Sequence, residues 1–196
     1  IARASTTKVI RGKLIDNQLK EVETLFVAEP YVHGLYHYGG GMIFGKDGKL
    51  YITIGERNFF EYMNPEIPVA QDVKDKRGKV IRINPDGSIP KDNPDFGPSS
   101  IKGLFAIGIR ASQGLTIHPE TGDIWFSEHG TNQGDELNIL KPSANYGWPN
   151  VTTGSYRTDY QPKAIPEATF TDPLYSWDHT VAPTGLTFYL GSEFPL

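Results

Sequence analysis

The densest polar segment of the chain runs from Glu128 to Asn138 and reads Glu-His-Gly-Thr-Asn-Gln-Gly-Asp-Glu-Leu-Asn. Its carboxylate, amide and backbone carbonyl oxygens are the hard ligands that Ca²⁺ prefers, although their spacing is not that of an EF-hand loop. Tyr146 follows, and its side chain or its carbonyl could complete a site begun by Asp135 and Glu136. Two interpretations stay open: a calcium site, or a solvated acidic turn that binds nothing.

Two further segments carry groups suited to catalysis. His37 stands ahead of the glycines Gly39 to Gly41, where the absence of side chains lets a flat ligand approach the backbone. Its imidazole can exchange a proton near neutral pH. Arg110 and Gln113 lie between two apolar runs, and a guanidinium can bind a carboxylate or polarise a carbonyl. The alternatives are a solvated histidine and a surface ion pair.

Composition narrows the class of protein. The 196 residues carry a formal net charge of −4, and the Lys and Arg residues are scattered, so we expect no nucleic-acid partner. There is no cysteine, which excludes disulfides and thiolate chemistry and means that redox chemistry needs a borrowed cofactor. No apolar run approaches the ~20 residues that span a bilayer, so no membrane span is expected.

Short strands are the expected elements. Gly (21) and Pro (15) are abundant, as in chains of many strands joined by turns. Apolar runs rich in β-branched and aromatic residues at 49–54, 79–83 and 123–126 predict strands. Asp47-Gly48 and Asp86-Gly87 supply the residues that tight hairpin turns require.

The sequence also repeats itself. Gly41-Met42-Ile43-Phe44 recurs as Gly114-Leu115-Thr116-Ile117, 73 residues on, and Gly185-Leu186-Thr187-Phe188 begins a third copy. Such a period indicates a repeat architecture, and it exceeds the usual length of a propeller blade. We therefore expect long inserts between strands, at 58–76 and 154–173. Chance similarity between ordinary hairpins is the alternative.

Taken in order, these motifs resemble those of the soluble PQQ-dependent glucose and aldose sugar dehydrogenases. The strongest are Ser127–Gly130, the Gly-Asp-Glu-Leu-Asn run ending at Asn138, and Asn145–Pro149. Further matches are His37–Gly40, Ala70–Asp72, Gly78–Arg82, Asp86–Pro94, Arg110 with Gln113-Gly114, and Ala182–Gly185. The resemblance covers about 11–195, essentially the whole chain.

The resemblance implies an all-β fold: about half of a six-bladed β-propeller, with four-stranded antiparallel blades and long inter-strand inserts. The chain would be one partial domain over 1–196 and, since it opens on Ile1 and ends at Leu196, we expect both ends to be truncated. The implied function is PQQ- and Ca²⁺-dependent oxidation of a sugar to a lactone, with an external electron acceptor and a periplasmic or secreted location. The alternative is a non-catalytic, calcium-binding propeller that serves as a binding module.

The resemblance also assigns roles by position. His37 falls on the general base, beside the cofactor. Arg110 and Gln113 fall on cofactor contacts, and Arg110 is also catalytic, placed to stabilise negative charge that develops on the quinone oxygen. The carbonyls of Gly130 and Thr131 fall on the ligands of the cofactor's Ca²⁺. Three residues fall near a structural calcium: Asp135, Glu136 and Tyr146. Three positions depart from the family pattern: Tyr36 for Asp or Asn before the base, Glu56 for the Asp of Gly-Asp-Arg, and Ala111 for the Asn after the arginine.

An incomplete ring has consequences of its own. The family's later segments supply basic residues that contact the PQQ carboxylates, so we expect this length of chain alone to be inactive. Open blade edges and an uncovered blade face also predict self-association.

Overall fold

The computed structural model describes residues 3–57, 67–157, 159–161, 165 and 168–194, which fold into β-strands, turns and loops without a helix. Ten strands are formed by these residues: β1 Lys8–Ile15, β2 Gln18–Val27, β3 Gly39–Phe44, β4 Leu50–Ile54, β5 Lys79–Ile83, β6 Leu104–Ile107, β7 Ser112–Ile117, β8 Ile124–Glu128, β9 Glu136–Ile139 and β10 Tyr175–Ser176. The three predicted strands are thus confirmed as β4, β5 and β8.

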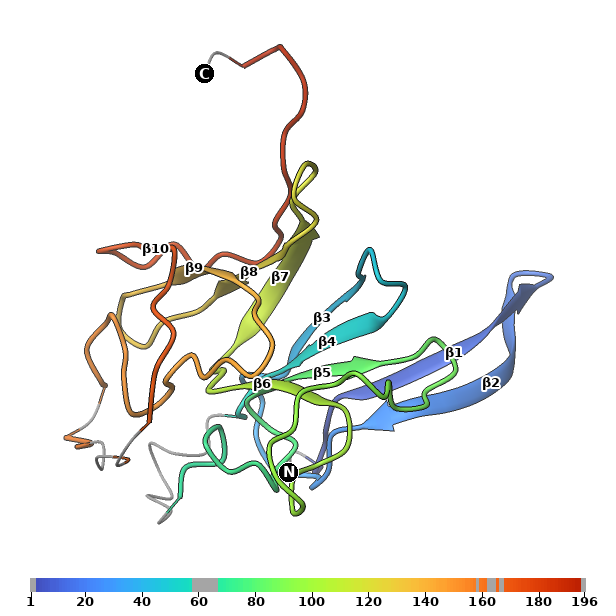
Figure 1. Ribbon diagram of the computed structural model, residues 1–196, viewed down its shortest axis with the longest axis horizontal. Helices are drawn as coiled ribbons and strands as arrows, with labels where there is room; N and C mark the ends of the chain where they lie inside the picture. Colours follow the sequence, from blue (N-terminus) through green and yellow to red (C-terminus); the bar gives the residue numbers. More distant parts are fainter. Residues whose placement is uncertain (1–2, 58–66, 158, 162–164, 166–167, 195–196) are drawn as a thin grey trace.

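The strands form one hairpin and two four-stranded sheets. The hairpin is β1-β2, and the sheets have the orders β3-β4-β5-β6 and β7-β8-β9-β10, with all neighbours antiparallel. Figure 1 shows the three sheets fanning out around one end, with β3–β6 between the hairpin and β7–β10. These are the four-stranded antiparallel blades of a β-propeller, which confirms the expected fold class.

The predicted period appears in the strand positions. The strands β3 and β7 begin 73 residues apart, and β6 and β10 begin 71 residues apart, whereas β5 and β9 are separated by only 57 residues. The difference arises because the long insert lies between β4 and β5 in the first blade and between β9 and β10 in the second. Each blade therefore carries a long connection, but at a different place.

The first blade is buried on both faces, and its alternating side chains fill two cores. Leu50, Ile52 and Ile54 pack into a core shared with the hairpin β1–β2. Tyr51 and Val80 face the opposite way, into a core shared with the second blade. Because side chains alternate across a strand, one short apolar run serves both interfaces. Each fully buried aliphatic side chain contributes about 1.5–3 kcal/mol to this packing.

The two blades approach most closely where β3 passes β7. A Cβ atom on Gly41 would lie 2.2 Å from Leu115 Cδ1 and 2.9 Å from the carbonyl oxygen of Gln113. Only glycine fits between the two strands here. This contact brings the beginning of β3 beside the beginning of β7, which is where the candidate site lies.

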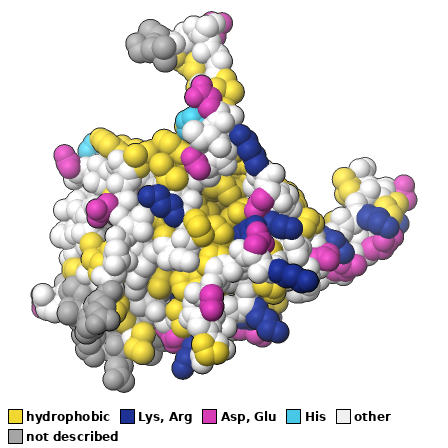
Figure 2. Space-filling view, viewed as in Figure 1, with side chains coloured by type: hydrophobic (Ala, Val, Ile, Leu, Met, Phe, Trp, Pro, Cys, Tyr) yellow, Lys and Arg dark blue, Asp and Glu magenta, His cyan; other side chains and the backbone are white. Residues whose placement is uncertain are grey.

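The hairpin β1–β2 projects from the rest of the molecule (Figure 1). Charged side chains of both signs line it (Figure 2), and they include the ion pairs Arg11–Glu23 and Lys13–Glu21. Leu14 and Leu19 are exposed between them, at 76% and 51%. The exposed surface of the hairpin therefore combines ion pairs with apolar side chains.

The third copy of the repeat does not form a strand. No strand is assigned over 181–190, although Gly185–Phe188 repeats the sequence of β3 and β7. A strand exists only in hydrogen-bonded pairs, and the described part of the chain contains no following strand with which this segment could pair as β3 pairs with β4 and β7 with β8. The segment packs along the second blade instead: a Cβ atom on Gly114 would lie 2.5 Å from the carbonyl oxygen of Thr184, and the centroid of the Phe188 ring lies 5.1 Å from that of Trp125.

Candidate active site

The candidate residues converge at one end of the two blades. A cavity of about 450 Å³ opens where β3 and β7 begin and the loop after β8 returns. Its lining includes six of the predicted site residues: His37, Arg110, Gln113, Gly130, Thr131 and Asp135. These residues lie up to nearly 100 positions apart in the sequence, so their assembly is a consequence of the blade arrangement.

His37 is oriented by a buried carboxylate. Its side chain is 14% exposed, and its Nδ1 lies within hydrogen-bonding distance of Oε1 of Glu56, whose side chain is 1% exposed. Because Nδ1 faces a carboxylate, it carries the ring hydrogen and donates it, which leaves Nε2 as the basic nitrogen. Glu56, noted in the sequence only as a departure from the family pattern, is therefore a candidate for the residue that positions His37.

Arg57 fixes the loop that carries the imidazole. Its guanidinium donates to the carbonyl oxygens of Tyr36, Ser5 and Gly34 at 3.0, 2.9 and 2.9 Å. The same group lies 3.6 Å from the centroid of the Tyr38 ring. A planar fork that binds three carbonyls and stacks on a ring holds the loop in one conformation.

Arg110 lies in the turn between β6 and β7 and is 3% exposed. Its guanidinium lies 5.0 Å from the ring centroid of Trp148 and donates to the carbonyl of His129 at 3.3 Å. Its backbone N–H donates to Oε1 of Glu128, and its carbonyl accepts from the N–H of Glu56 at 2.9 Å. The backbone of Arg110 thus connects both blades to the residue that orients His37.

Asp135 organises the loop at the far side of the cavity. Its Oδ1 accepts from the N–H of Gly130 at 2.7 Å, and its Oδ2 accepts from those of Val181 and Ala182, both at 2.7 Å. Three amide donors to a carboxylate that is 2% exposed hold the loop and the segment after β10 together.

Glu136 and Tyr146 line a different hollow. It holds about 10 Å³, room for one ion or water, and Glu128 also lines it. Burial and then the charge of Glu136 raise the pKa of Glu128 to about 8, and burial raises the pKa of Glu136. The hydroxyl of Tyr146 donates to the carbonyl of Ile139 at 2.7 Å, so only its carbonyl remains as a candidate ligand. The structure thus separates Asp135 from the other two predicted ligands.

In the described ranges, no group of three His, Asp or Glu side chains could hold an ion. The backbone carbonyls of Gly130 and Thr131, predicted as calcium ligands from the sequence, lie in the loop that lines the cavity.

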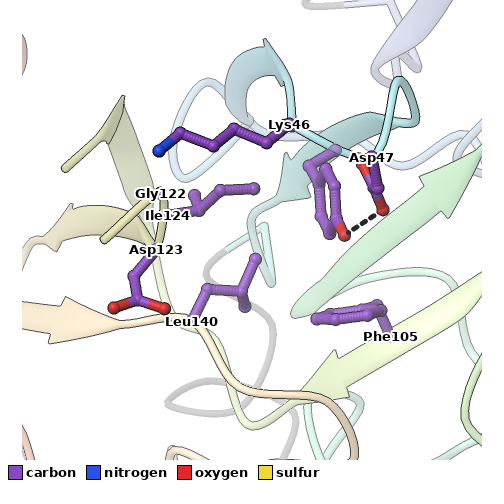
Figure 3. A pocket seen from close by; sticks show the side chains of 9 residues that line it. Lys46, Asp47, Phe105, Gly122, Asp123, Ile124 and Leu140 are labelled. Carbon is purple, nitrogen blue, oxygen red and sulfur yellow. Dashed lines mark hydrogen bonds between the residues drawn. The ribbon is translucent and has the colours of Figure 1, made fainter. Parts of the chain in front are cut away.

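A second cavity, of about 270 Å³, lies at the opposite ends of the same strands, between the β3–β4 and β7–β8 turns. Figure 3 shows Lys46, Asp47 and Asp123 around it, with Ile124, Leu140 and Phe105 beside them. Its lining in the described residues contains none of the predicted site residues. The chemistry proposed from the sequence thus belongs to the first cavity.

The fold and the cavity together define a class of protein: a β-propeller with a histidine–carboxylate pair and a buried arginine at one end. Residues 1–196 match the glucose / sorbosone dehydrogenase family, and the chain belongs to that family. Aldose sugar dehydrogenase YliI of Escherichia coli (strain K12) is 34% identical over an alignment of 198 positions, which covers 96% of this chain and 51% of that protein.

Two solved structures are similar. The soluble aldose sugar dehydrogenase of Escherichia coli in its apo form has a TM-score of 0.84 at 32% identity, covering 98% of this chain and 55% of that one. The PQQ-bound aldose sugar dehydrogenase of Streptomyces coelicolor has a TM-score of 0.70 at 29% identity, covering 93% and 49%. The chain therefore spans about half the length of the curated relatives it matches. In its described part, no helix is long and apolar enough to cross a membrane.

Three candidate site residues were not predicted. Glu56, which contacts His37, differs from the family's Asp. His129 lines the cavity, and its Nε2 lies 2.9 Å from the carbonyl oxygen of Pro183, but inside the acidic segment it has no signal of its own. Arg157 also lines the cavity. It lies in the insert between β9 and β10, and a single arginine in an insert carries no local signal of its role.

Proposed function

We propose that the whole protein is a PQQ- and Ca²⁺-dependent dehydrogenase that oxidises an aldose at its anomeric carbon to a lactone and passes the electrons to an external acceptor. The observation that carries the proposal is the His37–Glu56 pair at a cavity that Arg110 also lines. A buried carboxylate that fixes the tautomer of an imidazole lining a cavity is the arrangement that a general base requires. This pair therefore favours an enzyme over the non-catalytic alternative.

The donor set of the cavity fits PQQ, a flat molecule with quinone oxygens and carboxylates. Arg110 and Arg157 are cationic, Gln113 adds an amide, and all three line a cavity of about 450 Å³. Guanidinium groups bind carboxylates and carbonyl oxygens with charge-assisted hydrogen bonds. When bound, PQQ with its Ca²⁺ would supply the acceptor for the hydride that leaves the anomeric carbon.

The chain's own part of the reaction is proton transfer and orientation. Nε2 of His37 takes the proton of the anomeric hydroxyl, and the hydrogen bond from Nδ1 to Glu56 stabilises the imidazolium that forms. Loss of that proton and of one hydride from the anomeric carbon balances the oxidation of the sugar to the lactone. Arg110, almost wholly buried, provides fixed positive charge where negative charge develops.

Calcium is assigned to two places. The carbonyls of Gly130 and Thr131 would hold the ion beside the cofactor, in a loop that Asp135 orders. Glu136 and the carbonyl of Tyr146 would hold a structural ion in the small hollow. The raised pKa of Glu128 supports the second assignment, because a divalent cation there would offset the cost of burying this carboxylate and then its repulsion by Glu136.

The test uses the full-length protein with added PQQ and Ca²⁺, and it follows reduction of an artificial dye by glucose and other aldoses. Dye reduction that requires both additions supports the proposal. His37→Ala should lower kcat by about a hundredfold or more while PQQ binding, measured by absorption, is retained. Absence of dye reduction together with an unshifted PQQ absorption spectrum would contradict the proposed dehydrogenase function.

The remaining parts of the proposal concern the whole protein. A periplasmic or secreted location brings the site to external sugar and PQQ. The 196 residues by themselves should not oxidise sugar, because the relatives are about twice as long and the other half of the ring completes the cofactor's surroundings.

A further inference from the structure

Arg157 contacts one of the carbonyls assigned to calcium. Its Nε and Nη2 donate to the carbonyl oxygen of Thr131 at 3.1 and 2.8 Å. Arg157 also lines the cavity, at the edge formed by the insert between β9 and β10. A guanidinium therefore sits on the oxygen to which a Ca²⁺ ion would bind.

The insert is docked so that this contact is maintained. The hydroxyl of Thr153 donates to the carbonyl of Gly134 at 3.1 Å, and the N–H of Asn132 donates to the carbonyl of Ser155 at 3.3 Å. A Cβ atom on Gly154 would lie 2.0 Å from the carbonyl oxygen of Gln133, so the two backbones are in close contact. Arg157 follows directly after this docked stretch, and only its side chain needs to move to leave the carbonyl.

We propose that Arg157 is a displaceable stand-in cation: it occupies the Thr131 carbonyl when calcium is absent and turns to a carboxylate of the bound cofactor when calcium arrives. The proposal rests on the proposed function. A guanidinium hydrogen-bonded to a ligand oxygen lies close enough to repel a Ca²⁺ ion on that oxygen, so Arg157 lowers the affinity of the cofactor-free protein for Ca²⁺. An anionic ligand in the same cavity gives the released guanidinium a new partner, so cofactor and metal bind cooperatively.

The decisive measurement is Ca²⁺ binding by calorimetry to the metal-stripped, full-length protein without PQQ. Arg157→Ala should bind Ca²⁺ at least about fivefold more tightly than wild type, the lower end of couplings between linked sites. Arg157→Lys, which keeps the charge but not the two parallel donors, should lie between them. Arg11→Ala, on the projecting hairpin, should leave the affinity unchanged.

PQQ binding supplies the second readout. In saturating Ca²⁺, Arg157→Ala should bind PQQ at least about fivefold more weakly, measured by the shift of its absorption spectrum. The calcium titrations are repeated with Arg157→Ala and wild type that both also carry Glu136→Gln. A change in affinity that persists in this background belongs to the loop of Thr131 rather than to the small hollow. Thermal unfolding checks that each variant is folded.

The outcomes separate the two proposals. Wild-type protein that binds PQQ and Ca²⁺, with an unchanged or weaker calcium affinity in Arg157→Ala, overturns the role of Arg157 and leaves the dehydrogenase intact. Wild-type protein that binds neither ligand overturns both. A gain in calcium affinity that PQQ abolishes supports the exchange of partners.

Discussion

A neutral histidine presents a defined basic nitrogen when its other ring nitrogen donates its hydrogen to a fixed acceptor. Glu56 does this for His37, and the cost of burying its carboxylate is offset by the charge-assisted hydrogen bond and by the guanidinium of the next residue, Arg57. A glutamate is one methylene longer than the family's aspartate. The loop of His37 is therefore matched to the longer side chain, and replacement by the shorter one is not neutral.

Glu56→Gln should lower kcat by about a hundredfold, because an amide no longer stabilises the imidazolium and can favour the wrong tautomer. The change is nearly isosteric, so KM and the affinity for PQQ should stay close to wild type. Glu56→Asp should retain intermediate activity. Steady-state kinetics of the full-length holoenzyme check this, and equal kcat values in wild type and Glu56→Gln would remove Glu56 from the mechanism.

Asp135 shows that residue type alone does not determine what a carboxylate binds. An aspartate followed by a glutamate in a glycine-rich loop predicts a cation site, yet this carboxylate accepts hydrogen bonds from three backbone amides. Two of those amides belong to residues more than 40 positions away, so no local pattern could indicate them. The neighbouring Glu136, the first residue of β9, lines a separate hollow.

At the scale of elements, the sequence predicted the strands that belong to repeated or apolar segments. The repeat of Gly41 at Gly114 located the first strands of both blades, and the apolar runs located β4, β5 and β8. Gly185, the third copy, failed as a strand because hydrogen-bonded partners, not propensity, decide whether a strand forms. The inserts have no period, which is why Arg157 could be found only in three dimensions.

Lys79 ties one insert to its blade. The ammonium at the start of β5 donates to the carbonyls of Val69 and Arg77, both at 2.6 Å. Burial lowers its pKa from 10.5 to about 7, since no carboxylate hydrogen bond compensates the lost hydration. Between these two pH values the unfolded chain keeps a proton that the folded chain has lost, so the free energy of unfolding should rise with pH.

The expected rise between about pH 7.5 and 9.5 is at most about 1.4 kcal/mol per pH unit, the value for one proton. Lys79→Met should abolish it, whereas Lys13→Met on the exposed hairpin should not. Urea unfolding across this range measures both. Equal slopes in wild type and Lys79→Met would mean that Lys79 keeps its proton in the folded state.

At the scale of the whole molecule, the same arrangement that builds the cavity leaves surfaces uncovered. The first blade is covered on both faces, because the hairpin β1–β2 packs on one and the second blade on the other. The outer side of the hairpin and part of the segment after β10 stay exposed in the described structure. Leu14 and Leu190 are each 76% exposed, far more than a leucine inside a closed ring of blades would be.

A polypeptide of residues 1–196 alone should therefore associate with itself, since apolar side chains and open strand edges at both ends can pair with another copy. Light scattering should give a mass that rises with concentration. Leu14→Glu together with Leu190→Glu should lower that mass while the circular dichroism of the strands is unchanged, and Lys13→Met, which removes no apolar contact, should not lower it. A monodisperse monomer at all concentrations would show that this half of the propeller covers its own edges, and the case for a cavity completed by the rest of the ring would weaken with it.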